Sequence, residues 1–142
     1  MGSGDLPARP AKRLAVVACM DARLDPARVL GLEQGDAHVI RNAGGLARDA
    51  LRSLVISQQL LGTREVIILQ HTDCGMLKFE NEELHARLDD AAREIDFMPF
   101  SDLDQSVRDD VQFLKESPLI PDDVSVRGFV YDVETCLVRE VS

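Results

Sequence analysis

The sequence predicts an α/β fold, with a mainly parallel β-sheet flanked by helices and a C-terminal strand extension. Short runs of Val, Ile and Leu do not alternate with polar residues, which is typical of strands buried on both faces. Segments with helical spacing separate these runs, as in βαβ units. No linker is long enough to divide the 142 residues, so we expect one domain over 1–142 with a flexible N-terminal arm over 1–12.

The first half of the chain contains two expected strands and two expected helices. The apolar run 13–18 predicts the first strand, and Asp25-Pro26 offers an N-cap and a suitable first residue for a short helix. Residues 37–40 predict a second strand, which runs into a turn at 41–45 that contains two glycines. Apolar residues then recur at helical spacing over 46–61.

The second half continues the alternation. Residues 65–70 give the clearest strand in the chain, and the charged stretch 80–94 is helical in character. Another helix is expected to begin within 101–104, because apolar residues follow it on one helical face. A strand over 124–133 and a shorter one over 137–141 are expected to pair as a hairpin.

The composition of the chain argues against several classes of protein. The net charge of −9 repels phosphate backbones, so we expect no nucleic-acid partner. No apolar run has the length that crosses a membrane, and the N-terminus lacks the pattern of a secretory signal. Three cysteines, an odd number, argue against a disulfide framework. These features favour a cytoplasmic protein with no membrane partner.

Metal-binding residue types follow two of the expected strands. Cys19 comes directly after one strand, and His71 and Cys74 follow another. Because the carboxyl ends of parallel strands meet at one edge of a sheet, we expect the three side chains to lie close together. Two thiolates and one imidazole suit zinc, and three protein ligands leave the fourth position open, as in catalytic sites.

Asp21 and Arg23 lie close to Cys19 in the sequence. Zinc with two thiolates and a neutral imidazole has no net charge, so it acidifies a bound water less than zinc held by neutral ligands alone. We therefore expect Asp21 to accept a hydrogen bond from that water and orient it. The planar fork of Arg23 can pair with Asp21 and keep the carboxylate ionised and turned away from the metal.

Each of these patterns has an ordinary interpretation when it stands alone. A lone cysteine at a strand end is usually a small buried residue, and an Asp-x-Arg pair is usually a weak surface ion pair. His38, His85 and Cys136 are interpreted as ordinary side chains, with Cys136 structural. The two cysteines and the histidine, like the Asp-Arg pair, all lie immediately after predicted strands. We therefore favour a metal site over these ordinary interpretations.

Four segments resemble the β-class carbonic anhydrases in order and spacing, and are most like the small archaeal and mycobacterial members. They are Ala18-Cys19-Met20-Asp21-Ala22-Arg23-Leu24, Ile40-Arg41-Asn42-Ala43-Gly44-Gly45, His71-Thr72-Asp73-Cys74-Gly75-Met76 and Val126-Arg127-Gly128-Phe129-Val130-Tyr131-Asp132-Val133. The likeness covers nearly the whole chain from about Leu14.

The resemblance implies the fold of that family and zinc-dependent, reversible hydration of carbon dioxide to bicarbonate and a proton by a zinc-bound hydroxide. Asp21 and Arg23 would be the catalytic dyad, and the turn at Gly44 and Gly45 would let backbone approach the substrate. Arg41 is a candidate substrate contact or only a surface charge. One zinc ion per subunit would be held by Cys19, His71 and Cys74. The family also implies a homodimer or homotetramer.

Two other interpretations stay open from the sequence. The protein could hydrolyse a carbon dioxide analogue, carbonyl sulfide or carbon disulfide, because relatives with this fold do so with the same ligands. Alternatively the site is non-catalytic, either a structural zinc with Asp21 as a permanent fourth ligand or a metal-free redox pair of Cys19 and Cys74. Arg23 opposes the structural zinc because it offers Asp21 another partner.

Overall fold

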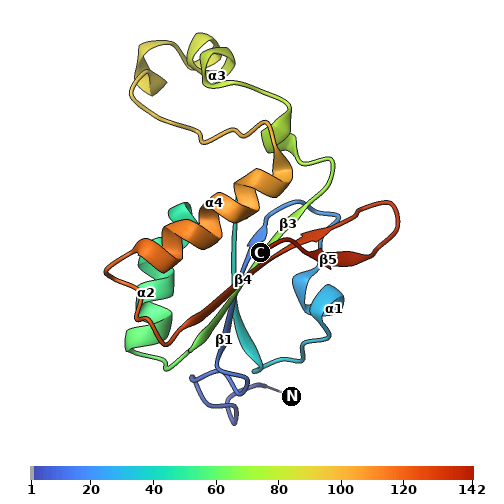
Figure 1. Cartoon of the computed structure of the whole chain (residues 1–142), viewed down its shortest axis with the longest axis vertical. Coiled ribbons are helices and arrows are strands. Elements are labelled where there is room, and N and C mark those ends of the chain that lie inside the picture. Colours follow the sequence, from blue (N-terminus) through green and yellow to red (C-terminus); the bar gives the residue numbers. More distant parts are fainter. Residues whose placement is uncertain (1) are drawn as a thin grey trace.

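The computed structural model describes residues 2–142 and contains a five-stranded sheet with the order β2-β1-β3-β4-β5 (Figure 1). The strands are β1 (Leu14–Cys19), β2 (Ala37–Asn42), β3 (Glu65–His71), β4 (Ser125–Tyr131) and β5 (Val138–Glu140). The first four are parallel, and β5 pairs antiparallel with β4 as the expected C-terminal extension. The α/β prediction is confirmed.

Helices lie against both faces of the sheet (Figure 1). Four are α-helical: α1 (Pro26–Leu30), α2 (Leu51–Gln59), α3 (Asn81–Leu88) and α4 (Leu103–Glu116). Three short 3₁₀ helices are η1 (Ala47–Ala50), η2 (Gly75–Leu77) and η3 (Asp89–Ala92). No helix within residues 2–142 is both long and apolar enough to span a bilayer.

The core is divided between the two faces because alternate residues of a strand point in opposite directions. Ala15 and Val17 of β1 belong to the cluster that contains Leu54 of α2 and Leu114 of α4. Val16 and its neighbours on the other face belong to the cluster against which α1 packs. Strand β1 is therefore buried on both faces, which explains its continuous apolar run.

The N-terminal segment ends against the loop that precedes β2. The backbone N–H of Ala11 donates to the carbonyl of Gly35 (2.8 Å), and that of Lys12 donates to the carbonyl of Asp36 (2.9 Å). Pro10 is buried. The flexibility of the N-terminal arm stays a prediction, but its last residues are hydrogen-bonded to the folded domain.

The helix expected over 46–61 begins as the 3₁₀ helix η1 and continues as α2. Two side chains determine this start: Asn42 Oδ1 accepts the backbone N–H of Leu46 (2.8 Å), and Asp110 Oδ2 accepts that of Ala47 (2.7 Å). The helix expected over 80–94 is likewise divided, because Asp89 has φ 57° and interrupts the helical path after α3.

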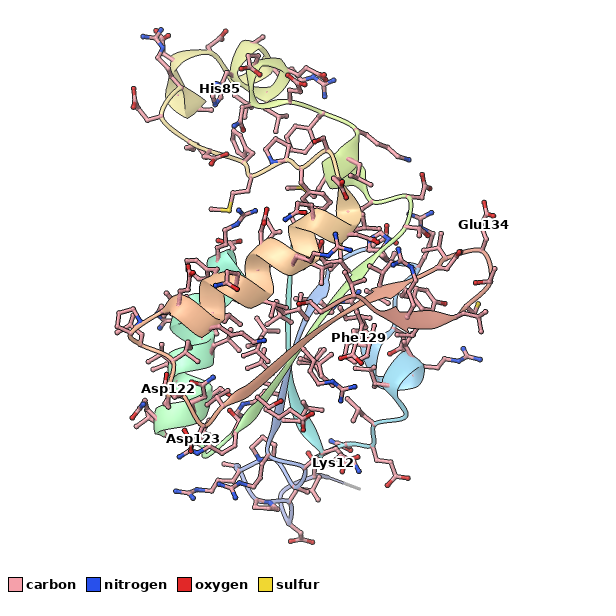
Figure 2. All side chains as sticks on the ribbon, viewed as in Figure 1. Lys12, His85, Asp122, Asp123, Phe129 and Glu134 are labelled. Carbon is pink, nitrogen blue, oxygen red and sulfur yellow. The ribbon has the colours of Figure 1, made fainter. Side chains whose placement is uncertain are left out.

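The segment that carries α3 projects beyond the end of the sheet (Figure 1). None of the residues of α3 is buried. His85 lies in this projecting segment (Figure 2), where its Nε2 is 2.8 Å from the carbonyl of Ile95. This environment agrees with the interpretation of His85 as an ordinary side chain.

Asp110 is a fully buried carboxylate that links α4 to η1. Besides the N–H of Ala47, its neighbours are Gln70 Nε2 at 3.5 Å and the partly exposed Arg48 Nε at 3.6 Å. Burial raises the pKa of Asp110 from its ordinary value of 3.8 to about 6. The folded protein therefore binds this proton more tightly than the unfolded chain does.

This difference predicts a pH-dependent contribution to stability. The stabilisation is present below the unfolded pKa of Asp110 and is lost as the pH rises through the folded value of about 6. Relative to the Asp110→Asn variant, the free energy of unfolding of the parent should fall by roughly 2 kcal/mol between about pH 4 and pH 7. Urea unfolding of the parent and of Asp110→Asn across this range measures the difference. A difference that does not change with pH would contradict the prediction.

Candidate metal centre

The candidate metal centre lies at the carboxyl ends of β1 and β3, which are neighbours in the sheet. The chain passes from β1 to β2 on one side and returns to β3 on the other, so this edge is a topological switch point. Cys19 ends β1, His71 ends β3, and Cys74 lies in the following loop. All three are buried, and their ligand atoms lie within 4.8 Å of one another. The two loops thus meet as the sequence predicted.

The ring of His71 is oriented for metal binding. Its Nδ1 is 2.7 Å from the carbonyl oxygen of Thr72, which can only accept, so Nδ1 carries the hydrogen. Nε2 then presents a lone pair, and it is buried with no hydrogen-bond partner within residues 2–142. A carbonyl that fixes the outer nitrogen is the usual support for a metal-bound imidazole. The residues present therefore fit a zinc ion.

The contact between the two thiols couples their ionisation. The contact with Cys74 lowers the pKa of Cys19, assisted by the ring of His71, although burial opposes this shift. The same contact, together with burial, raises the pKa of Cys74 well above its ordinary value. Burial also disfavours protonation of His71, but its contacts with Cys19 and Thr72 outweigh this and raise its pKa. The pocket thus accommodates one thiolate by itself, and a second requires a nearby cation.

Asp21 lies beside the three ligands in the loop after β1. Its Oδ2 is 3.7 Å from Nε2 of His71. Arg23 donates from Nε to Oδ1 (3.0 Å), from Nη2 to Oδ2 (2.8 Å) and from its backbone N–H to Oδ1 (2.8 Å). The hydrogen bonds from the Arg23 side chain and backbone lower the pKa of Asp21 well below its usual range. The expected Asp-Arg pair therefore forms, with an ionised carboxylate.

Arg23 also binds the loop that contains the other two ligands. Its Nη1 donates to Asp73 Oδ2 (2.9 Å), and its Nη2 donates to the backbone carbonyl of Asp73 (2.9 Å). Lys78 Nζ lies 2.6 Å from the other carboxylate oxygen of Asp73. These two cations lower the pKa of Asp73, with Lys78 the larger cause. Sequence reasoning missed Asp73 and Lys78, although Asp73 stands between His71 and Cys74.

Arg41 holds the backbone that carries Cys19 and Asp21. Its Nε donates to the carbonyl of Cys19 (2.9 Å), and its Nη2 donates to the carbonyls of Asp21 (2.8 Å) and Leu24 (2.7 Å). Three charge-assisted hydrogen bonds fix the course of this loop. This role was not among the two that the sequence offered for Arg41, and substrate binding by its side chain stays a prediction.

The turn at Gly44 and Gly45 packs directly on the metal-binding loops. Gly45 has φ 65°, and a Cβ there would lie 2.7 Å from the backbone nitrogen of Cys19, so only glycine fits. A Cβ on Gly44, which has φ 89°, would lie 3.1 Å from Met76 and 3.2 Å from Phe100. The close backbone approach at Gly45 is thus to Cys19. Contact of either glycine with substrate stays a prediction.

Two further residues that the sequence raised lie outside the centre. His38 Nδ1 is 2.7 Å from Ser57 Oγ on α2, as expected of an ordinary side chain. Cys136 is exposed in the turn between β4 and β5. Neither belongs to the cluster of Cys19, His71 and Cys74.

Comparison with known proteins identifies the family. A family model described as carbonic anhydrase matches residues 14–98. The chain is 46% identical over 146 aligned residues to β-carbonic anhydrase 1 of Mycobacterium tuberculosis, covering 98% of this chain and 88% of the relative. The chain belongs to the β-carbonic anhydrase family. The solved carbonic anhydrase from Glaciozyma antarctica superposes with a TM-score of 0.95 at 50% identity, covering 98% of this chain and 87% of that one.

The chain is also similar to enzymes that are named for another substrate. A carbon disulfide hydrolase from Acidianus sp. is 37% identical, and the alignment covers 91% of this chain and 77% of the relative. Membership of the β-carbonic anhydrase family therefore leaves both substrates to be considered.

Proposed function

We propose that this protein is a zinc-dependent carbonic anhydrase that catalyses the reversible hydration of carbon dioxide to bicarbonate and a proton, with one zinc ion per subunit. The observation that supports this proposal most strongly is the buried cluster of two thiols and His71, whose Nε2 has no hydrogen-bond partner in the described part of the chain. An ionised carboxylate, Asp21, lies beside this cluster. Higher identity to a β-carbonic anhydrase than to a carbon disulfide hydrolase supports carbon dioxide as the substrate.

Cys19, His71 and Cys74 would hold the zinc ion, which supplies a Lewis acid that lowers the pKa of water. The ionised carboxylate of Asp21 accepts a hydrogen bond from the attacking water and orients it toward the substrate carbon. Arg23 keeps that carboxylate charged, because its fork binds both oxygens.

Hydrolysis of carbon disulfide is a second candidate, supported by the relatives of that name. Stopped-flow measurement of carbon dioxide hydration by metal-analysed protein, with carbonyl sulfide and carbon disulfide measured in parallel, separates the two. We expect rapid hydration of carbon dioxide and slow turnover of both sulfur compounds. If either sulfur compound is turned over faster than carbon dioxide is hydrated, that compound and not carbon dioxide is the substrate.

The non-catalytic interpretations have less support. Both carboxylate oxygens of Asp21 are hydrogen-bonded to Arg23, which opposes a permanent bond from Asp21 to zinc. The imidazole of His71 lies with Cys19 and Cys74 in one cluster, and a redox pair of the two cysteines would have no need of this ligand. A catalytic zinc site uses all three groups.

The exposed edge of β2 supports a homodimer, and a homotetramer would need a further contact. Within residues 2–142, β2 is an outer strand of the sheet, and apolar Val39, Ile56 and Leu60 are exposed on it and on or next to α2. Unpaired strand edges readily pair with another chain. Sedimentation velocity tests this association.

The three free thiols suit a reducing compartment, so we also propose a cytoplasmic location.

A further inference from the structure

Four charged side chains form a continuous chain of contacts beside the metal centre. Arg23 donates to both Asp21 and Asp73, and Asp73 divides its carboxylate between two cations. One oxygen of Asp73 faces Nη1 of Arg23 at 2.9 Å, and the other faces Nζ of Lys78 at 2.6 Å. Asp21 and Asp73 thus bind one guanidinium at the same time, and Lys78 pairs with Asp73.

The position of Asp21 matters because its carboxylate has two possible partners. Oδ2 is only 3.7 Å from Nε2 of His71, so a small rotation brings it within reach of a metal held there. Carboxylate oxygens are good zinc ligands, and such a bond would fill the position that substrate chemistry needs. The guanidinium of Arg23 is the group that holds Asp21 in the alternative position.

Arg23 itself requires support. Its side chain is 47% exposed, and a long exposed arginine loses considerable rotamer freedom when it is fixed. Asp73 supplies two acceptors, a carboxylate oxygen that binds Nη1 of the guanidinium and a backbone carbonyl that binds Nη2. The left-handed backbone at Asp73, with φ 54°, presents both acceptors to Arg23 at once.

We propose that Asp73, paired with Lys78, is a positioning residue that fixes Arg23 and so keeps Asp21 away from the metal. The inference rests on the proposed metal site, and it adds a second carboxylate that controls whether the fourth coordination position is open. Asp73 acts through Arg23 and Asp21, and it is not one of the three residues of the metal-binding cluster.

The test uses cobalt-substituted protein and binding of thiocyanate, followed by the visible absorption of cobalt. Thiocyanate binds the metal only when Asp21 does not, so its apparent Kd increases as the fraction of open sites decreases. Asp73→Asn keeps a residue that tolerates positive φ and removes the charge that holds Arg23. We expect thiocyanate binding to weaken by about fivefold or more in this variant. Lys78→Gln should give a smaller change of the same sign.

Two controls separate positioning from other effects. Loss of a negative charge alone would strengthen anion binding, which is the opposite sign. Asp104→Asn removes a carboxylate from another exposed Asp-Arg pair, with Arg139, and should leave thiocyanate binding unchanged. In the Asp21→Ala background, Asp73→Asn should no longer weaken binding, because the competing carboxylate is absent.

Three results would overturn the inference in distinguishable ways. Unchanged or tighter thiocyanate binding by Asp73→Asn would show that Asp73 does not hold Arg23 in place. Equal weakening with and without Asp21 would show that Asp73 does not act through Asp21. A parent protein that binds no cobalt would overturn the metal site as well, whereas cobalt-loaded protein with no effect of Asp73→Asn overturns this inference alone.

Discussion

Replacing Cys74 with alanine is expected to remove the zinc ion and abolish carbon dioxide hydration. The variant leaves only Cys19 and His71 from the buried cluster, and zinc in proteins almost always has at least three protein ligands. Loss of residues that merely support a ligand costs roughly 10- to 100-fold in metal affinity, so loss of the ligand itself should cost more than about 100-fold.

Metal analysis after exhaustive dialysis, combined with stopped-flow hydration, measures both effects of Cys74→Ala. Cys136→Ala is the matched control, because it removes an exposed thiol outside the cluster. The control should retain one zinc per chain and the parental rate. A Cys74→Ala protein that kept a full complement of zinc would show that another residue is the ligand.

Replacing Asp21 with alanine should separate metal binding from catalysis. The three ligand side chains remain, so the zinc content should stay at one ion per chain. The carboxylate that orients the attacking water is lost, and a positioned group of this kind typically contributes about 10²- to 10⁴-fold. We therefore expect the rate of carbon dioxide hydration to fall by at least about 100-fold.

Asp104→Ala is the comparison for Asp21→Ala, because it also breaks an Asp-Arg pair but lies on α4 beside β5. Metal analysis and stopped-flow kinetics of the two variants should agree in zinc content and differ in rate. If Asp21→Ala hydrates carbon dioxide as fast as the parent, Asp21 has no role in the reaction.

The strands and the cluster of three metal-binding residues were predictable because both depend on local patterns and on one general property of parallel sheets. An uninterrupted apolar run identified β1, and the shared edge of parallel strands placed Cys19 near His71. Predicting that Cys19 lies near His71 required only that the two strands that they end are parallel members of one sheet.

Other features depend on contacts that no local pattern encodes. The 3₁₀ start at η1 depends on Asp110, which is 63 residues from Ala47 along the chain. The guanidinium of Arg41 binds three carbonyls across a loop, and carbonyls carry no sequence signal. The contact between Arg23 and Asp73 spans 50 residues, so neither residue indicates the other from the sequence.

X-ray absorption at the zinc edge of the purified protein tests the metal centre most directly. We predict two sulfur ligands at about 2.3 Å and one imidazole nitrogen at about 2.0 Å, with a fourth, light ligand that added anions replace. A zinc ion with four protein ligands that no added anion displaces, or one without sulfur ligands, would contradict it.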